Sequence, residues 1–492
     1  MRCVLGIDLG TTNFKFAVVD QSGRILSLDR DRVEYTFRET DDGRLSCELD
    51  VNLFARMIKS GISRACARGG VESSEIAGVS YASQANTFLL IDNASQPLTP
   101  FVSWQDTSKR PGADSIEELA SDREFERTGL GSYSNGILAA RTLWFQRRRS
   151  ELWRRVRRIS TISDYLCTLL TGEAVGDSGT AARLGIWDVV GNRWWDRGLE
   201  FAGIDRAMLP RIFGPGSIVG RVSRDGEDNF GIPAGTPVVA GSLDHHVAAL
   251  GAGIGAGSGK ACESTGTVIS CTRLTEAFRP TSGISFGAGT ADGAYYAVAF
   301  DNAGGAVLRA FRDRYLPGMS YADLDRLAAL APPGVRDMYL GYLASPFGSV
   351  DAFSVAEEPD EEDKPEEISD EIAGMNARGI MEAGAMRLRR LIKTLFSNQI
   401  PGEISASGGG GTSEIWTQIK ADVVGSTFAH LDSEEPGCLG AAGLAGIGAG
   451  WHTKESPVPD SWVRVKKTVR PDRQNNRIYR RLLAGNPAIS LE

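Results

Sequence analysis

Residues 6–20 read GIDLGTTNFKFAVVD, and this stretch decides the fold class that we predict for the chain. A short apolar strand ends beside Asp8, a glycine- and threonine-rich turn follows, and an alternating strand leads away, which is the pattern of a β-hairpin. The turn consists of Gly10, Thr11, Thr12 and Asn13. Glycine permits a turn with positive φ, and the three polar residues present N–H groups and hydroxyls. We expect this turn to surround nucleotide phosphates, with an ordinary hairpin turn as the alternative.

Two charged residues flank this turn. Asp8 ends the first strand, and Lys15 lies two residues beyond the turn. Mg²⁺ keeps several waters and is held by one or two carboxylates plus phosphates, so Asp8 is the candidate metal-binding residue. Lys15 is expected to point at phosphate or at solvent.

A second copy of the same pattern begins the other half of the chain. Residues 262–271 read CESTGTVISC, again strand, Gly/Thr turn and strand, with Gly266 and Thr267 in the turn and Glu263 before it. Two such hairpins, each opening a half of the chain, are a rarer coincidence than one. Duplicated halves with a cleft between them would place a ligand at their interface.

Residues 238–253, VVAGSLDHHVAALGAG, place Asp244 after an apolar strand and before a helix of small residues. Phosphoryl transfer needs a base that accepts the proton of the nucleophile, and a carboxylate at a strand end suits that role. The alternative is a helix N-cap, for which Asp is a favoured residue. His245 and His246 lack further ligands at zinc spacing, so we expect them to have packing roles.

A glycine run follows a strand in the second half, within ISASGGGGTSEIWTQIKADVVG. Gly409, Gly410 and Gly411 allow a flat ligand to approach the backbone, and the helix after them offers an N-terminus. We interpret the run as a shelf for a nucleotide base or ribose, with a flexible loop as the alternative. GIGAGSGKA has the wrong spacing for a P-loop, and GAGIGA lacks the context of a dinucleotide-binding turn.

Polar residues in two further segments suit a polyhydroxylated ligand. VSYASQANTFLLID contains Gln84 and Asn86, and PFVSWQDTSKR contains Trp104 and Asp106. Amides and a carboxylate hydrogen-bond to hydroxyls, and an indole stacks on a ring or chain. Polar residues at an exposed sheet edge are the alternative.

The composition limits the class of protein. The 492 residues, with a hydrophobic content of 42%, favour two domains of an ordinary globular protein. The net charge of −8 argues against a general nucleic-acid binder, and we expect the basic run 147–158 to be a solvated helix face. Seven cysteines without a CxxC pair, no signal-peptide core and no long apolar segment favour the cytoplasm and no membrane association.

The order of these motifs resembles the FGGY carbohydrate kinase family of the actin-like ATPase superfamily. GIDLGTTNFKFAVVD and ESTGTVISC resemble its two phosphate motifs, GSLDHHVAALGAG its catalytic segment, and ASGGGGTSEIWTQIKADVVG its adenosine motif. SQANTFLLID and WQDTSKR align with its sugar-contact segments, and EPGCLGAAGLAGIG with its closing helix. The resemblance covers about residues 3–450.

The resemblance implies an α/β fold of two actin-like ATPase (ribonuclease H-like) domains, residues 1–250 and 251–450, with a catalytic cleft between them and an appendage at 451–492. It also implies ATP and Mg²⁺ as cofactors and a small-molecule sugar as the acceptor. Asp244 becomes the general base, and Thr267 is placed near the phosphates. A ketopentose such as xylulose, or another ketose, is the favoured acceptor, and a homodimer is one option for assembly.

Departures from the family pattern leave the sugar open. Asn86 stands where xylulose kinases usually have a histidine, and Ser108 stands where an arginine is common. YLASPFGSVDAF replaces a GERTP-like segment. The alternatives are therefore a glycerol or other polyol kinase, an actin-like protein in which nucleotide drives conformational change, and a sugar sensor without catalysis, which the presence of Asp8 and Asp244 disfavours.

Overall fold

A computed structural model describes residues 2–110, 118–131, 136–255, 257–335, 368–433 and 435–485. The segment YLASPFGSVDAF and most of the acidic segment 351–370 lie outside the described residues. The chain forms two compact units, each assembled from three segments. The first unit comprises Met1–Gly257, Leu274–Ala297 and Glu435–Val463, and the second comprises Ser258–Arg273, Val298–Glu434 and Arg464–Glu492.

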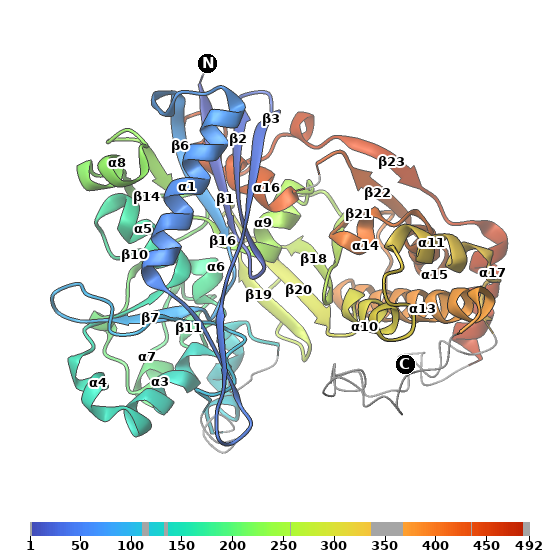
Figure 1. The fold of residues 1–492 in the computed structure, drawn as a ribbon, viewed down its shortest axis with the longest axis horizontal. Coiled ribbons are helices and arrows are strands. Elements are labelled where there is room, and N and C mark those ends of the chain that lie inside the picture. The colour runs from blue at the N-terminus through green and yellow to red at the C-terminus, as the bar shows by residue number, and fades with distance from the viewer. Residues whose placement is uncertain are drawn as a thin grey trace. The chain divides into compact units, whose positions relative to one another are not determined.

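The first unit is built on a mixed sheet in which the hairpin of the phosphate turn is central (Figure 1). Every residue of its first strand is buried, which explains the continuous apolar run CVLGIDL. That strand pairs antiparallel with the next strand of the chain and parallel with β6. The strands, in sheet order, are β14 (Ile218–Arg221), β15 (Pro237–Val239), β6 (Ile76–Ser83), β1 (Cys3–Leu9), β2 (Asn13–Asp20) and β3 (Ile25–Arg32), with β16 (Ser242–Leu243) also pairing with β6.

Helices cover this sheet. The longest of them buries Phe54, Met57, Ile58 and Ile62 against the sheet, as the apolar spacing of residues 50–69 predicts. Asp50 caps its N-terminus by accepting a bond from the N–H of Leu53. The helices of this part are α1 (Val51–Gly69), α5 (Ile162–Thr171), α6 (Ser178–Ala181), α8 (Arg224–Phe230), α9 (Asp244–Gly251) and α16 (Pro436–Gly448).

Helix α16 comes from the far end of the chain, yet it packs against β1, β6 and α9. Two glycines make the contact with α9 close. A Cβ atom on Gly440 would lie 2.0 Å from the carbonyl oxygen of Val247, and one on Gly251 would lie 1.9 Å from that of Pro436. Any larger residue at either position would therefore push the two helices apart.

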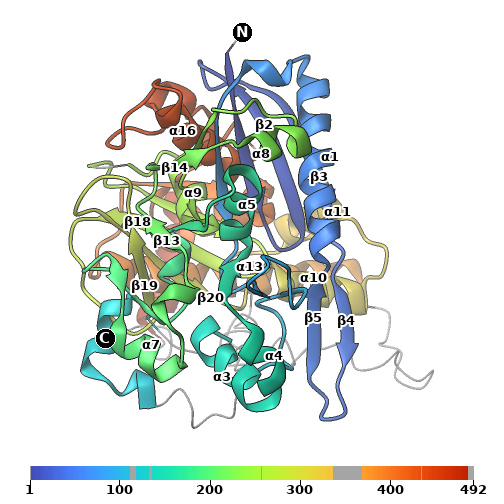
Figure 2. The same cartoon turned by 90° about the vertical axis from the view of Figure 1, so that its left-hand side faces the viewer.

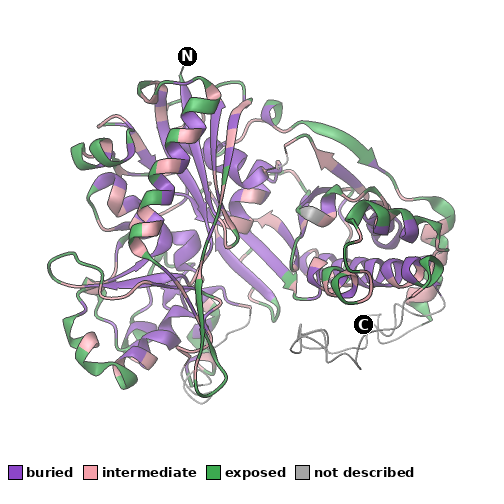
Figure 3. Cartoon of the chain, viewed as in Figure 1, coloured by how far each residue is buried: buried purple, intermediate pink, exposed green. Residues whose placement is uncertain are grey.

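A smaller sheet completes the first unit and carries an exposed hairpin formed by β4 and β5 (Figures 2 and 3). Its strands, in order, are β4 (Thr36–Glu39), β5 (Leu45–Leu49), β8 (Phe101–Val102), β7 (Phe88–Ile91) and β9 (Arg158–Thr161). The neighbouring elements are α3 (Leu138–Arg148), α4 (Ser150–Arg155), α7 (Asp196–Ala202), and the strand pairs β10 (Val175–Asp177) with β13 (Arg211–Phe213) and β11 (Trp187–Asp188) with β12 (Arg193–Trp194).

The second sheet repeats the hairpin pattern of the first. The order β20-β18-β17-β21-β22 matches β3-β2-β1-β6-β15, with the Gly/Thr hairpin again central and the next two strands parallel to it. The strands are β17 (Ala261–Thr265), β18 (Ile269–Thr275), β19 (Ile284–Ala288), β20 (Tyr295–Asp301), β21 (Glu403–Ser407), β22 (Thr427–Leu431) and β23 (Val465–Val469). This duplication confirms the predicted fold class of two actin-like α/β domains.

The longest helix of the second unit, α13 (Asp370–Leu395), has sixteen buried residues. Figure 3 shows that it is buried along much of its length. The helices are α10 (Gly305–Tyr315), α11 (Tyr321–Leu330), α13 (Asp370–Leu395), α14 (Gly409–Thr412), α15 (Glu414–Val424) and α17 (Arg473–Ala484). None of the helices in the described ranges combines the length and the apolar character needed to span a membrane.

The last forty or so residues, expected as an appendage, take part in the packing of both units. Strand β23 pairs antiparallel with β22, and α17 packs against α15. The hydroxyl of Tyr479 donates to Glu382 at 2.6 Å and accepts from Arg378 at 3.1 Å, and all three side chains are buried. Residues 451–463 belong to the first unit. The compact units are thus interleaved along the chain, whereas the sequence-based boundaries at about 250 and 450 are contiguous.

Candidate active site

Three strands of the first unit end at the same edge of the sheet. Strands β1 and β16 both run parallel to β6, and Asp8 and Ser242 both lie opposite Ala82. Asp244 directly follows β16, and Gln84 directly follows β6. The carboxyl ends of parallel strands are where open α/β sheets bind ligands. The topology therefore brings Asp8, Gln84 and Asp244 to one edge.

Asp244 is the first residue of α9, and its carboxylate is half-buried. The cap position belongs to Leu243, so the helix-capping alternative does not hold. Oδ1 accepts a bond from the neighbouring N–H of His245 at 2.8 Å. Within the part of the chain that the structure describes, Oδ2 has no hydrogen-bond partner. A carboxylate oxygen at a ligand-binding edge is thereby left available to accept a proton.

A partly buried charge cluster lies beside the phosphate turn. The ammonium of Lys15 lies 3.1 Å from Oδ2 of Asp8 and 2.8 Å from Oε2 of Glu435, which begins the α16 segment. Burial raises the pKa of Asp8; Lys15 opposes this effect and the nearby carboxylate of Asp244 adds to it. Burial lowers the pKa of Lys15, but Asp8 and Glu435 outweigh it and hold that pKa above its usual range.

The sequence predicted that Lys15 points at phosphate or solvent and that Asp8 binds Mg²⁺, and this cluster involves both residues. Lys15 points to the carboxylates of Asp8 and Glu435. No group of three or more metal-ligating side chains occurs among the described residues. Asp8 still fits Mg²⁺, because that ion takes one or two carboxylates and completes its shell with water and phosphate oxygens. A cation there would also relieve the repulsion between Asp8 and Asp244.

Arg183 lies near Asp244, and the sequence analysis did not single it out. Burial lowers the pKa of Arg183 to about 10, and Asp244 opposes that effect. Its Nη1 atom is buried without a hydrogen-bond partner among the described residues. A buried N–H group without a partner is costly, so this donor suits a ligand oxygen.

All four predicted sugar-contact residues use polar side-chain atoms within the protein. The side-chain nitrogen of Gln84 donates to the carbonyl oxygen of Gly10 at 3.1 Å. Asn86, with a φ of 60°, donates to the carbonyl oxygen of Arg183 and accepts from the N–H of Leu138. These two residues therefore fix the loops around the site.

The third, Asp106, is fully buried. It accepts bonds from the N–H of Cys47 at 3.0 Å and from the ammonium of Lys109 at 2.9 Å. Burial raises the pKa of Asp106, but these bonds outweigh it and hold that pKa below its usual value. Asp106 thus holds the loop that carries the fourth candidate, Trp104.

Trp104 is the predicted contact that remains accessible, with 44% of its surface exposed. Its indole N–H donates to the hydroxyl of Thr11 at 2.9 Å, which joins the sugar-contact segment to the phosphate turn. The indole therefore offers a face next to a candidate phosphate-binding group.

Arg141 organises this whole region from inside the protein. Its side chain is fully buried, and its guanidinium donates to four backbone carbonyl groups and, among the described residues, to no carboxylate. The acceptors are the carbonyl oxygens of Asn86, Ser103, Trp104 and Asp106, at 3.1, 2.7, 2.7 and 3.0 Å. Burial lowers the pKa of Arg141 to about 10. A single cation thus joins the two candidate sugar segments.

His246 is a packing residue, as expected. It is buried, its ring stacks on Tyr296 with centroids 5.2 Å apart, and its Nδ1 lies 3.2 Å from the hydroxyl of Ser242. Burial lowers the pKa of His246 to about 3, so the ring is neutral at physiological pH.

The second unit contains a pocket of about 470 Å³ that brings together the predicted nucleotide-binding motifs. Gly266 and Thr267 of the second Gly/Thr turn line it together with Gly410 of the glycine run. Helices α10 and α11 contribute Arg309 and Tyr321, which the sequence did not single out. A volume of this size suits a drug-sized ligand, and the half-exposed ring of Tyr321 offers a stacking face.

Close packing against the Gly/Thr turn also explains why glycine occupies position 410 of the run. A Cβ atom on Gly410 would lie 2.5 Å from Cγ2 of Thr265, so the run lies directly against the Gly/Thr turn. The buried ammonium of Lys420 donates to Oε1 of Glu263 at 2.7 Å and to the carbonyl oxygen of Gly410 at 3.3 Å. Ser413 caps the following helix by accepting from the N–H of Trp416. The turn, the run and α15 therefore form one connected support.

Comparison with known proteins identifies the family. The model of the N-terminal domain of the FGGY family of carbohydrate kinases matches residues 3–251, and the model of its C-terminal domain matches residues 363–449. The chain belongs to the FGGY family of carbohydrate kinases. Members of this family are ATP-dependent phosphotransferases, so the chain is a carbohydrate kinase that uses ATP.

Similar FGGY proteins differ in their named substrates. A xylulose kinase of Staphylococcus epidermidis is 24% identical over 99% of this chain and 96% of its own length. An autoinducer-2 kinase of Escherichia coli is also 24% identical, over 97% and 92% of the two chains. These relatives agree on kinase activity and leave the acceptor undecided.

Solved structures support the fold. A xylulose kinase from Lactobacillus acidophilus has a TM-score of 0.83 at 20% identity and covers 98% of this chain and 96% of its own. A gluconate kinase from the same organism has a TM-score of 0.82 at 20% identity, with coverage of 98% and 96%. Plasmodium falciparum glycerol kinase with ADP has a TM-score of 0.78 at 17% identity, with coverage of 100% and 99%.

The bonds of Arg141 predict a positioning role in this FGGY kinase. Arg141→Lys keeps the charge but cannot donate to four carbonyl groups, so the Trp104 loop should shift. We expect the KM for the sugar to rise about tenfold or more, with the KM for ATP nearly unchanged, because a small displacement weakens substrate alignment. Steady-state kinetics with each substrate varied measures both constants. Arg155→Lys, on exposed α4, is the control. A normal sugar KM in folded Arg141→Lys would contradict the role.

Proposed function

We propose that this FGGY kinase transfers the γ-phosphate of ATP to a hydroxyl of a small ketose, with a ketopentose such as xylulose as the favoured acceptor. The observation that carries the proposal is the unpartnered Oδ2 of Asp244 at the sheet edge that also carries Asp8. The xylulose kinases among the relatives and similar structures support the choice of acceptor.

Asp244 acts as the general base. Its carboxylate accepts the proton of the acceptor hydroxyl while the hydroxyl oxygen bonds to the γ-phosphorus and the bond from that phosphorus to the ADP oxygen breaks. The unpartnered Nη1 of Arg183 donates to a substrate oxygen beside Asp244. The indole of Trp104 provides the apolar face on which the sugar carbons pack.

Each unit offers phosphate-binding groups in its own Gly/Thr turn. In the first unit these are the N–H groups and hydroxyls of Gly10, Thr11, Thr12 and Asn13. Asp8 would hold Mg²⁺ through water, and the ion would neutralise phosphate charge. Lys15 keeps the Asp8 carboxylate in place.

In the second unit, Gly266 and Thr267 bind phosphate, and Gly409, Gly410 and Gly411 form the shelf for the adenosine. Tyr321 packs beside the base: its ring lines the same pocket, is 46% exposed and has the guanidinium of Arg312 4.2 Å from its centroid. Gln84, Asn86 and Asp106 act on the sugar through the loops that they fix, since their polar atoms are bonded to the protein.

A panel of acceptors tests the choice of sugar. Coupled ADP release is measured with D-xylulose, D-ribulose, D-fructose, an autoinducer-2 precursor, gluconate and glycerol. We expect kcat/KM for a ketopentose to exceed that for glycerol and for gluconate by at least about tenfold, because a site built for particular hydroxyls rejects analogues that leave its polar groups unpaired. A higher kcat/KM for glycerol than for every ketose would contradict the proposed ketose acceptor and would favour a glycerol or polyol kinase.

A further inference from the structure

A second hollow in the first unit lies outside the site just described. It has a volume of about 910 Å³ and is formed by the β4–β5 hairpin, the segment Ser108–Arg110 and the end of α3. We call it the arginine groove. Figure 2 shows the hairpin and the helices α3 and α4 in the same part of the molecule.

Seven cationic side chains line the arginine groove, against three carboxylates. The β4–β5 hairpin contributes Arg38 and Arg44, and the segment Ser108–Arg110 contributes Lys109 and Arg110. The three arginines at residues 147–149 come from the C-terminal end of α3. This excess of positive charge is notable in a chain whose net charge is −8. Like charges gathered around one hollow repel each other, and an anion between them would remove that cost.

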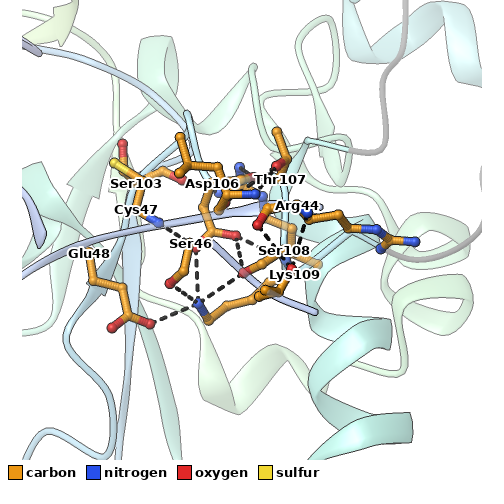
Figure 4. Close-up of polar contacts among 12 residues, drawn as sticks. Arg44, Ser46, Cys47, Glu48, Ser103, Asp106, Thr107, Ser108 and Lys109 are labelled. Atoms are coloured by element: carbon orange, nitrogen blue, oxygen red, sulfur yellow. Dashed lines mark hydrogen bonds and ion pairs between the residues drawn. The ribbon is translucent and has the colours of Figure 1, made fainter. Parts of the chain in front are cut away.

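Two of the three carboxylates of the groove are paired, and the third, Glu39, has no ion pair among the described residues. Asp42 pairs with Arg44 at 3.1 Å, and Glu48 pairs with Lys109 at 2.7 Å. Figure 4 shows Lys109 between Glu48, Ser46 and Asp106, so this lysine is part of the supporting structure. Lys109 therefore pairs with carboxylates of the protein itself and is not available to a ligand.

Four guanidinium groups of the groove remain without an ion pair within the described part of the chain. They are those of Arg38, Arg110, Arg148 and Arg149. The Nε atom of Arg110 is buried and has no hydrogen-bond partner there either. Burial lowers the pKa of Arg110, the carboxylate of Asp106 opposes this effect, and neighbouring Arg44 adds to it. A guanidinium in such surroundings is stabilised by a bound anion.

We propose that the arginine groove binds a small molecule carrying two or more phosphate groups. Guanidinium groups bind phosphate in a bidentate manner, and cations on two walls can engage separate phosphates of one ligand. The volume lies within the range of small-molecule sites. The acidic net charge disfavours a nucleic acid as the occupant.

Tripolyphosphate serves as the probe, and titration calorimetry without divalent ions measures its Kd and stoichiometry, so that binding at the phosphate turns is counted as a separate site. We expect the double variant Arg148→Gln/Arg149→Gln to bind about tenfold more weakly or worse, because each charge-assisted contact contributes roughly a tenfold factor. Arg154→Gln/Arg155→Gln removes the same charge from neighbouring α4, which does not line the groove, and should stay within about twofold of the wild type.

Arg38→Gln provides a test from the opposite wall. Its side chain is exposed and has no ion pair among the described residues, so folding should be unaffected. It should weaken tripolyphosphate binding, and Kd should rise steeply with salt. A wild-type Kd weaker than about 1 mM, or equal values for the α3 and α4 double variants, overturns the proposal. The readout is binding alone, so it is independent of the sugar assignment.

Discussion

Asp244→Asn is expected to reduce sugar-dependent ADP formation by about 10²–10⁴-fold, which is the usual contribution of a general base. The amide keeps the size of the side chain but cannot accept the proton of the acceptor hydroxyl. Asp244 lies in the first unit, outside the pocket that we propose for the adenosine, so the Kd for ATP should stay within about twofold.

Coupled ADP release measures turnover, and calorimetry measures ATP binding to the same preparation. Asp228→Asn makes the same chemical change at an exposed position of α8 and should leave kcat unchanged. Near-wild-type turnover by Asp244→Asn would contradict the assignment of the base, whereas loss of ATP binding as well would indicate a folding defect.

Lys420→Met is expected to destabilise the second unit by about 3–5 kcal/mol, because removal of one partner leaves the other charge of a buried pair uncompensated. Lys420 and Glu263 are both fully buried, with nitrogen and oxygen 2.7 Å apart. The double variant Lys420→Met/Glu263→Leu should recover most of this loss, because no buried charge remains.

Thermal and denaturant unfolding followed by tryptophan fluorescence measures these changes, since Trp416 lies beside Lys420. Lys467→Met is the matched control. Lys467 pairs with Glu414 at 2.8 Å, but half of its side chain is exposed, so its removal should cost less than about 1 kcal/mol. Equal stability of Lys420→Met and Lys467→Met would show that the buried pair does not support the glycine run.

The local motifs were readable from the sequence because each lies on one continuous segment. The Gly/Thr hairpins occur where the apolar strands and the turn residues predict them, and the glycine run follows its strand and forms the short helix α14. The repetition of the hairpin predicted two halves, and the strand orders confirm it.

Other features depend on contacts between distant segments. The return of α16 to the first sheet depends on the fit of Gly440 against Val247, which no local pattern reveals. Arg141 reaches four carbonyl groups that are up to 55 residues away, and Arg183 meets Asp244 only in the folded chain. Gln84 and Asp106 form their hydrogen bonds with residues that are distant in the sequence. Residue type and the resemblance to the family assigned them to the sugar, and neither reveals these bonds.

The most direct test of the account follows the phosphorus itself. The ³¹P spectrum of wild-type protein with ATP, Mg²⁺ and D-xylulose or the best acceptor of the panel distinguishes transfer to sugar from transfer to water. We predict one equivalent of a sugar phosphate ester for each ADP formed, and almost no ADP when the sugar is left out. ADP accompanied only by inorganic phosphate, at a rate that no sugar changes, would contradict sugar phosphorylation and would favour an actin-like protein driven by nucleotide hydrolysis.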